Sequence, residues 1–134
     1  MKYSFDNPPF KIRELSEEYF DLKKVLPVWT FGDTIYNPHK QIINRVLLEH
    51  EKIHQKQQSD KPAEWWHKYF NDDKFRFEQE LEAYRHQYQF VKSFVKSRND
   101  LFNFLKAIAG DLSGKMYGNM CSLLEAIIKI KNMV

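Results

Sequence analysis

The sequence predicts a mainly helical α+β fold, a single small domain over residues 1–134 with one small β element. Three observations support this prediction. Apolar residues recur every three or four positions over several long segments, as in amphipathic helices. The segment 28–36, VWTFGDTIY, is rich in β-branched and aromatic residues around a Gly-Asp pair, which is typical of a tight hairpin or a bent strand. The composition, 43% hydrophobic and 16% aromatic, is sufficient for one core.

The first half of the chain contains two predicted helices around the β element. Residues 1–15 are interrupted by prolines and are predicted to form an extended N-terminal arm. Ser16 is predicted to open a short amphipathic helix over about 16–26, which Pro27 closes. Asn37-Pro38 resembles a helix start, with Asn as N-cap and Pro at the first helical position. The helix that follows is expected to run to about Ser59.

The second half of the chain is predicted to be helical throughout. Pro62 either ends the preceding helix or starts a short one that carries Trp65 and Trp66. The remaining predicted elements are a helix over about 74–97 capped by residues 71–73, a helix after Asp100, a loop marked by Gly110, Gly114 and Gly118, and a last helix over about 119–131.

Charge and cysteine content exclude several classes of protein. The net charge is +3, and the basic residues alternate with acidic ones, which favours solvated helix faces and argues against a nucleic-acid partner. Cys121 is the single cysteine, so no intrachain disulfide can form, and a reducing compartment fits. The N-terminus has no apolar signal-peptide segment, and no apolar stretch has bilayer length. A cytoplasmic protein without a membrane segment is therefore expected.

The stretch LLEHEKIHQKQQ contains the pattern HExxH at residues 50–54. On a helix, His50 and His54 lie one turn apart on the same face and can direct nitrogen atoms at one metal ion. Glu51 is rotated by about 100°, where it can act as general base on water beside the metal. The alternative is a charged helix with incidental histidines. Both histidines share a face with Val46 and Leu47, and imidazoles directed at a core need a partner, which a zinc ion would supply.

A catalytic zinc usually takes three protein ligands, and the sequence offers several candidates for the third. Metzincins use HExxHxxGxxH; here Asp60 is at the final position, but Gln57 replaces the glycine that allows the turn. Peptide deformylases use a cysteine that precedes HExxH, whereas Cys121 follows it. The last option is a glutamate of the next long helix, where the segment RFEQELEAYRHQ contains Glu78, Glu80 and Glu82.

HEKIHQKQQ followed by ELEAY resembles the gluzincins, the thermolysin-like clan of zinc peptidases. With FGDTIYNP, the Trp-rich segment and LSGKMYGNMCSLLEA, the pattern resembles the minimal gluzincin-type metallopeptidases encoded by phages and prophages over most of residues 28–126. The resemblance implies a helical minidomain with a small hairpin or sheet beside the HExxH helix. It also implies zinc-dependent hydrolysis of peptide or protein substrates, in the host cytoplasm if the chain is phage-encoded.

The resemblance assigns zinc ligation to His50, His54 and Glu80 and general-base catalysis to Glu51. Glu80 shares a helix face with Tyr84, Gln87 and Val91, consistent with an inward direction, whereas Glu78 and Glu82 fall about 160° to either side. Tyr84 departs from the pattern, because many gluzincins have there an aspartate that orients a zinc-binding histidine.

Several other residues near the motif have candidate roles. Tyr117, in the glycine-flanked loop 113–118, is a candidate donor to the oxyanion, with His86 and Tyr84 as further candidates; a core aromatic is the alternative for Tyr117. Segment 31–36 could offer an edge strand to a peptide, unless both edges are covered. Gln57 and Gln58 could brace loops or be solvated, and Trp65 and Trp66 are expected to pack in the core.

Three alternatives to this peptidase stay open. One is a non-catalytic, zinc-stabilised phage structural or scaffold protein, although a purely structural site would not need Glu51. The second is a repressor-cleaving peptidase of a mobile element, which shares HExxH and Glu-x-Glu-Ala but continues with Asn-x-Phe-Ala where this chain has Tyr84-Arg85-His86. The third is a helical nucleic-acid-binding domain. The oligomeric state is left open.

Overall fold

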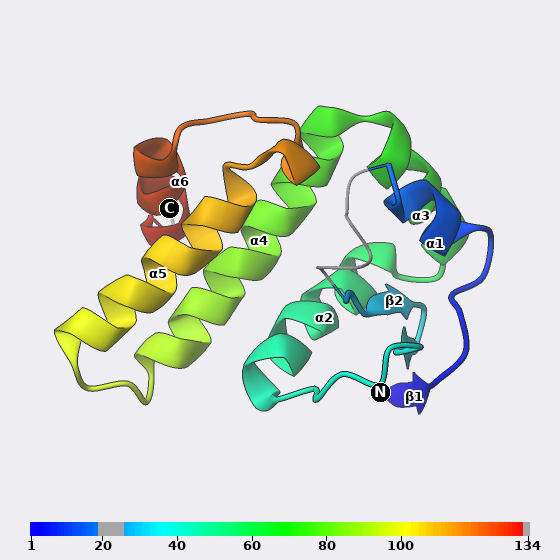
Figure 1. Cartoon of the computed structure of the whole chain (residues 1–134), viewed down its shortest axis with the longest axis horizontal. Helices are drawn as coiled ribbons and strands as arrows, with labels where there is room; N and C mark the ends of the chain where they lie inside the picture. Colours follow the sequence, from blue (N-terminus) through cyan, green and yellow to red (C-terminus); the bar gives the residue numbers. More distant parts are fainter. Residues whose placement is uncertain (19–25, 133–134) are drawn as a thin grey trace.

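Helices dominate the structure of the chain, as predicted for a mainly α (α+β) protein (Figure 1). The computed structural model describes residues 1–18 and 26–132. Its elements in chain order are β1 (Lys2–Ser4), α1 (Ile12–Ser16), β2 (Trp29–Phe31), β3 (Thr34–Tyr36), α2 (Arg45–Gln58), α3 (Pro62–Asn71), α4 (Asp73–Lys92), α5 (Arg98–Leu112), the 3₁₀ turn η1 (Lys115–Tyr117) and α6 (Leu123–Lys131).

The predicted hairpin over 28–36 is confirmed and is part of a three-stranded sheet. β2 and β3 pair antiparallel, with Phe31 opposite Thr34, so Gly32 and Asp33 form a two-residue turn. Gly32 has φ 61°, a left-handed conformation that glycine adopts without strain. β1 pairs in parallel with β3, which gives the strand order β1-β3-β2. The predicted extended arm over 1–15 is therefore only partly confirmed. Lys2–Ser4 are extended but paired with β3, and the chain is helical from Ile12.

The predicted role of Ser16 as the start of a helix is wrong. Ser16 is the last residue of α1, and its buried hydroxyl donates to the carbonyl of Ile12, one turn earlier, at 2.7 Å. The same oxygen accepts the indole N–H of Trp29 at 2.9 Å. These bonds satisfy the hydroxyl inside the protein, so it is not free to cap a following helix. Most of the predicted helix over 16–26 lies outside the described residues.

The predicted helix start at Asn37-Pro38 is also wrong, because α2 begins seven residues later at Arg45. The side chain of Asn37 brackets Gln41 instead: its Oδ1 accepts the Gln41 N–H and its Nδ2 donates to the Gln41 carbonyl, both at 2.9 Å. This closes a turn in which Lys40 has φ 53°. Asn44 is the true N-cap, with its Oδ1 accepting the N–H of Leu47 at 2.9 Å.

The later helices are confirmed, with changed boundaries. Pro62 starts α3, and Asp72 caps α4 by accepting the N–H of Phe75. α4 ends at Lys92 rather than near Ser97. Ser97 is instead the N-cap of α5. Gly110 lies inside α5, whereas Gly114 and Gly118 flank η1. In the described part of the chain, no helix has both the length and the apolar character needed to cross a membrane.

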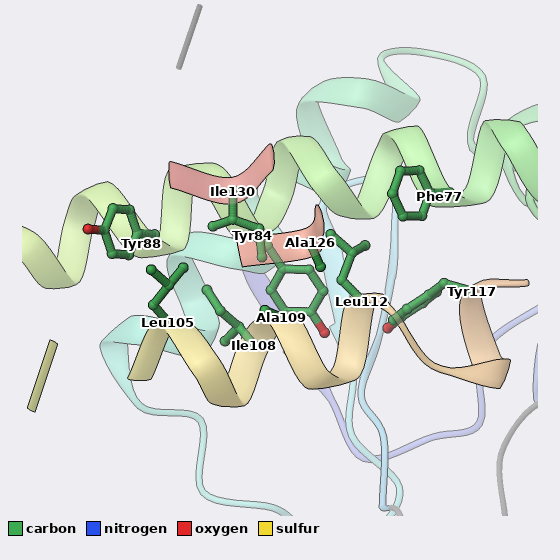
Figure 2. Packing of buried hydrophobic residues seen from close by; sticks show 10 residues of the cluster. All are labelled: Phe77, Tyr84, Tyr88, Leu105, Ile108, Ala109, Leu112, Tyr117, Ala126 and Ile130. Atoms are coloured by element: carbon green, nitrogen blue, oxygen red, sulfur yellow. The ribbon is translucent and has the colours of Figure 1, made fainter. Parts of the chain in front are cut away.

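Two apolar clusters lie on either side of a polar layer. The first joins α4, α5, α6 and η1 (Figure 2), and its buried members include Phe77, Leu105, Leu112 and Ile130. The second is mainly aromatic and joins α1, β2 and α3. α4 runs through the molecule and contacts α2, α3, α5 and α6 (Figure 1). The layer between α2 and α4 contains the predicted site.

Candidate metal centre

The buried face of α2 is polar. The residues of this helix that are most deeply buried are His50, Glu51, His54 and Gln58, with exposed fractions between 2% and 8%. The sequence had suggested that apolar neighbours would share this face, but Val46, Leu47 and Ile53 are only partly buried, and Ile43 precedes the helix. Burial of titratable and amide groups costs free energy unless each group has a partner. The polar face of α2 therefore indicates a functional site.

α4 brings a carboxylate to the two imidazoles. Oε1 of Glu80 lies 3.0 Å from Nε2 of His50 and 3.0 Å from Nε2 of His54, and the two Nε2 atoms are 3.1 Å apart. Zinc bonds of about 2.0–2.1 Å in a tetrahedral arrangement place neighbouring ligand atoms about 3.3 Å apart. The structure therefore brings His50, His54 and Glu80 together, and after small shifts their three ligand atoms could hold one metal ion.

Each histidine is oriented from behind by a glutamine. Nδ1 of His50 is 2.9 Å from Oε1 of Gln87, and Nδ1 of His54 is 2.8 Å from Oε1 of Gln57. The Gln57 amide nitrogen donates to the carbonyl of Gln79 and to the carboxylate of Glu82, so its oxygen must face His54. His54 therefore carries its proton on Nδ1 when neutral and presents the Nε2 lone pair, as a metal-binding histidine should.

The arrangement of these atoms suits a cation. With Nδ1 of both rings facing amide oxygens, the two Nε2 atoms and Oε1 of Glu80 are three acceptors in mutual contact. Burial alone would lower the pKa of His54, but the charge and hydrogen bond of Glu80 outweigh it and raise the pKa to about 9. Burial would likewise raise the pKa of Glu80, yet the histidines hold it well below its usual range. A proton on His54 or a metal ion satisfies the group.

Tyr69 on α3 fixes the carboxylate of Glu80 from the other side, and the sequence had not indicated it. Its hydroxyl donates to Oε2 of Glu80 at 2.6 Å, which leaves Oε1 facing the histidines. Burial and the adjacent Glu80 charge raise the pKa of Tyr69 well above its usual value, so it remains a donor. Tyr69 is held in turn by Arg76, 1% exposed, whose guanidinium donates to the carbonyl of Tyr69 at 2.8 Å and to that of Met116 at 3.1 Å.

Glu51 lies in the wall of a cavity of about 350 Å³ at the centre. The cavity is also lined by His50, His54 and Glu80 and by residues that lead into β2. Glu51 is 5% exposed, and within the described residues its carboxylate makes no hydrogen bond. Burial raises its pKa, against the opposing effect of the histidines. A carboxylate that is buried, unpartnered and open to a cavity is suited to accept a proton there.

Tyr117, the first candidate for the oxyanion donor, and Tyr84, a further candidate, lie side by side at the cavity wall. Tyr84 packs edge-on against the His50 ring, with ring centroids 4.7 Å apart, and its own ring centroid lies 6.3 Å from that of Tyr117. Figure 2 shows their hydroxyl groups pointing toward one another. Tyr117 is 5% exposed, belongs to the α4–α5–α6 cluster and also lines the cavity. Its position is therefore compatible both with a core aromatic and with a donor to the oxyanion. Tyr84 contacts His50 through its ring. The hydrogen bond that orients the His50 ring comes instead from Gln87.

The other candidate ligands lie away from the centre. Asp60 is exposed beyond the end of α2, Cys121 packs against the α4–α5–α6 cluster, and Glu78 faces Lys74 on the surface. Glu82 accepts from Gln57 and supports the site only through that amide. His86, a candidate oxyanion donor, pairs with Glu49 at 3.1 Å and does not line the cavity, so that assignment is wrong.

The strand next to the site is β2, not β3 as the segment 31–36 suggested. β3 is paired on both sides, by β1 and β2. On the free side of β2, the carbonyl of Thr30 accepts from Gln58 Nε2 at 2.7 Å and from Trp66 Nε1 at 2.9 Å. The Gln58 amide oxygen also accepts the N–H of Gly32 at 2.8 Å, so this glutamine braces the hairpin against α2. Trp65 and Trp66 are buried in the aromatic cluster, as predicted.

No protein-family model matches the sequence, and neither the curated proteins nor the solved structures compared with the chain include a match. The fold and site define the chain as a small α+β protein with a His-His-Glu group able to hold a metal ion. Its function has to be inferred from the geometry and chemistry of that group.

Proposed function

We propose that this protein is a zinc-dependent metallopeptidase of the gluzincin type. The observation that carries the proposal is the mutual contact of His50 Nε2, His54 Nε2 and Glu80 Oε1, at 3.0–3.1 Å, beside the unpartnered Glu51. Two imidazoles and one carboxylate are a donor set of catalytic zinc, and a fourth position would face the cavity. A purely structural zinc site would need neither a cavity nor Glu51.

The residues around the centre have distinct roles in this proposal. A zinc ion held there would polarise the scissile carbonyl and lower the pKa of a water molecule that it binds. Glu51 accepts the proton of the attacking water and passes it to the leaving amine, a task that its raised pKa favours. Gln57, Gln87 and Tyr69 hold the ligand atoms in place. Tyr117 is the candidate donor to the oxyanion, through its own hydroxyl, which points toward that of Tyr84 (Figure 2).

A peptide substrate would lie along the side of the cavity formed by β2 and the residues before it. Val28, Trp29 and Thr30 line the cavity opposite the α2 motif. Because backbone groups alternate along a strand, Val28 and Thr30 face the same edge, and the Thr30 carbonyl is already engaged by Gln58 and Trp66. We therefore expect an extended peptide to pair mainly with the backbone at Val28.

Metal content of the purified protein, beside its Glu80→Ala and Glu51→Gln variants, tests the proposal. We expect one zinc per chain in the native protein, weaker retention in Glu80→Ala and full retention in Glu51→Gln. Peptide hydrolysis by the native protein should be lost in Glu51→Gln. Absence of zinc after purification in zinc-replete medium would overturn the proposal.

The same measurements separate the alternatives. The native protein and Glu51→Gln could retain zinc while Glu80→Ala loses it, with no hydrolysis of any peptide or repressor-like protein. That result would indicate a site that serves only to stabilise the fold. Cleavage limited to a repressor protein would identify the mobile-element subclass. Binding to nucleic acid at low salt that weakens steeply with added salt would indicate the third alternative.

A further inference from the structure

Asp111, at the end of α5, is a carboxylate of the cavity that the proposed reaction does not use. It lines the same cavity as His50, Glu51 and Tyr84. The residue as a whole is exposed, yet enough protein surrounds the carboxyl group that burial raises its pKa, which His50 only partly offsets. Within the described residues, its side chain has no hydrogen bond and no ion pair.

Asp111 is unfavourable for the stability of the fold because of its place in the helix as well as its unpaired, partly buried carboxylate. It lies in the last turn of α5, where the carbonyl ends of the helix give a negative potential, and that turn contains no basic residue. A carboxylate that is partly buried, unpaired and at the wrong end of a helix contributes nothing to stability. Such a group is more readily explained by binding than by folding.

Asp111 does not orient the ligands of the metal site. Nδ1 of His50 already faces Gln87, and its Nε2 faces Glu80, so neither ring nitrogen is left for Asp111. The carboxylate is therefore free to meet a group that enters the cavity from outside.

The surroundings of Asp111 suit a cationic side chain with an apolar stem. Among the described residues that line the cavity, none is lysine or arginine, whereas three, Glu51, Glu80 and Asp111, are acidic. A zinc ion would balance Glu80 and Glu51, which leaves the charge of Asp111 uncompensated. Ile108, one turn earlier on α5, and Met116 line the same cavity and offer apolar surface next to the carboxylate.

We propose that Asp111 is a specificity-determining residue that selects peptides with a lysine or arginine side chain close to the scissile bond. This inference rests on the proposed peptidase function and names its substrate class. The aliphatic stem of the substrate side chain lies on Ile108 and Met116, and its cationic end pairs with the Asp111 carboxylate.

The test uses short capped peptides that differ at one position, occupied by lysine, by its uncharged analogue norleucine or by glutamate. Equilibrium binding is measured with the zinc-loaded Glu51→Gln variant, and cleavage with the native protein. We expect the lysine peptide to bind about tenfold more tightly than the norleucine peptide, the gain that one hydrogen bond to a charged group can supply, and the glutamate peptide to bind worst.

Two further variants assign the preference to a residue. Asp111→Asn, which keeps the shape of the side chain, should abolish the preference for lysine and leave the affinity for norleucine unchanged. Asp60→Asn removes an exposed carboxylate that does not line the cavity and should keep the preference. Equal binding of the three peptides, or a preference that survives Asp111→Asn, would overturn the role of Asp111.

The two readouts distinguish failure of this inference from failure of the peptidase proposal. Cleavage of all three peptides at equal rates would keep the peptidase and remove the role of Asp111. Charge-selective binding without cleavage would keep Asp111 and remove the peptidase. If none of the peptides binds, both proposals fall.

Discussion

The hydroxyl of Tyr69 donates to Oε2 of Glu80 at 2.6 Å and thereby assigns the other carboxylate oxygen to the two histidines. This contact joins α3 to α4 and restricts the carboxylate to one orientation. A carboxylate with one oxygen held by a phenol binds a metal through the other oxygen, at little cost in conformational freedom.

Replacement of Tyr69 by phenylalanine is expected to weaken zinc binding by about 10- to 100-fold, the range typical of a lost hydrogen bond to a ligand. Competition with a chelator measures the affinity. Tyr88→Phe is the matched control, because Tyr88 is a buried tyrosine of α4 whose hydroxyl points away from the cluster in Figure 2. Equal zinc affinity of Tyr69→Phe and the native protein would show that the contact does not orient Glu80.

Loss of the Gln57 amide should release the ring of His54. Gln57→Ala is expected to lower zinc affinity by about tenfold and, in the metal-free protein above about pH 9, where the His54 ring is neutral, to allow both of its tautomers. NMR of the ring nitrogens reports the tautomer, and chelator competition reports the affinity. Gln55, on the same helix, has no side-chain hydrogen bond to the part of the chain that the structure describes, so Gln55→Ala should change neither. A single Nδ1-protonated tautomer that persists in Gln57→Ala would contradict this role.

The metal-free protein should lose stability as the solution becomes alkaline. Glu80 raises the pKa of His54 to about 9 in the fold, above the value of about 6.5 in the unfolded chain. The bound proton therefore stabilises the fold fully below pH about 6.5, and this contribution is lost as pH rises through about 9. The free energy of unfolding in urea, with chelator present, should fall by at most about 3 kcal/mol over this range.

The zinc-loaded protein is the control for this pH dependence. Both imidazoles are neutral as ligands, so the fall between about pH 6.5 and 9 should be absent when the site is filled. A metal-free protein whose unfolding free energy stays constant over the same range would show that His54 and Glu80 do not share a proton.

Tyr117→Phe is expected to reduce turnover by about 100-fold and to leave zinc content unchanged, if its hydroxyl reaches the developing oxyanion. The buried ring keeps its packing in the phenylalanine variant, so the effect isolates the hydroxyl. Turnover of a susceptible peptide and metal analysis are measured on the same preparation. Native turnover would leave Tyr117 with the packing role alone.

Arg76 supports the site indirectly through the backbone. Arg76→Met would leave the carbonyls of Tyr69 and Met116 without their donor, and we expect a loss of about 3 kcal/mol in the free energy of unfolding. Asp73→Asn weakens another contact of the same guanidinium, at 2.6 Å, but Asp73 is largely exposed and its replacement should cost much less. Urea unfolding of the two variants compares them; equal losses would contradict a buried backbone role for Arg76.

Local patterns predicted the hairpin, the later helices and the α2 half of the site, but not β1 or α1. The spacing of His50 and His54 is a property of one helix, and the hairpin turn and the later helices have strong local signals. The start of α2 was misplaced because Asn37 and Asn44 are both competent caps, and only the pairing of Asn37 with Gln41 decides between them. The parallel pairing of β1 with β3 joins residues some thirty positions apart, which no local pattern reveals.

Tyr69 and Asp111 escaped prediction for a related reason. Tyr69 is one aromatic residue among several in α3, and Asp111 is an ordinary helical acid until the end of α5 meets the cavity. Their importance comes from packing between elements, which spacing along one helix does not record. An acidic residue in the last turn of a helix without a basic neighbour was the available signal for Asp111.

The polar face of α2 also has a mechanical consequence. The α4–α5–α6 cluster and the aromatic cluster of α1, β2 and α3 meet across a layer in which α2 places imidazole, carboxyl and amide groups rather than apolar side chains. A metal bound by α2 and α4 would act as a cross-link between the two halves of the protein. Its removal would let them open independently, and amide hydrogens of β2 and α2 would then exchange with solvent sooner than those of α5.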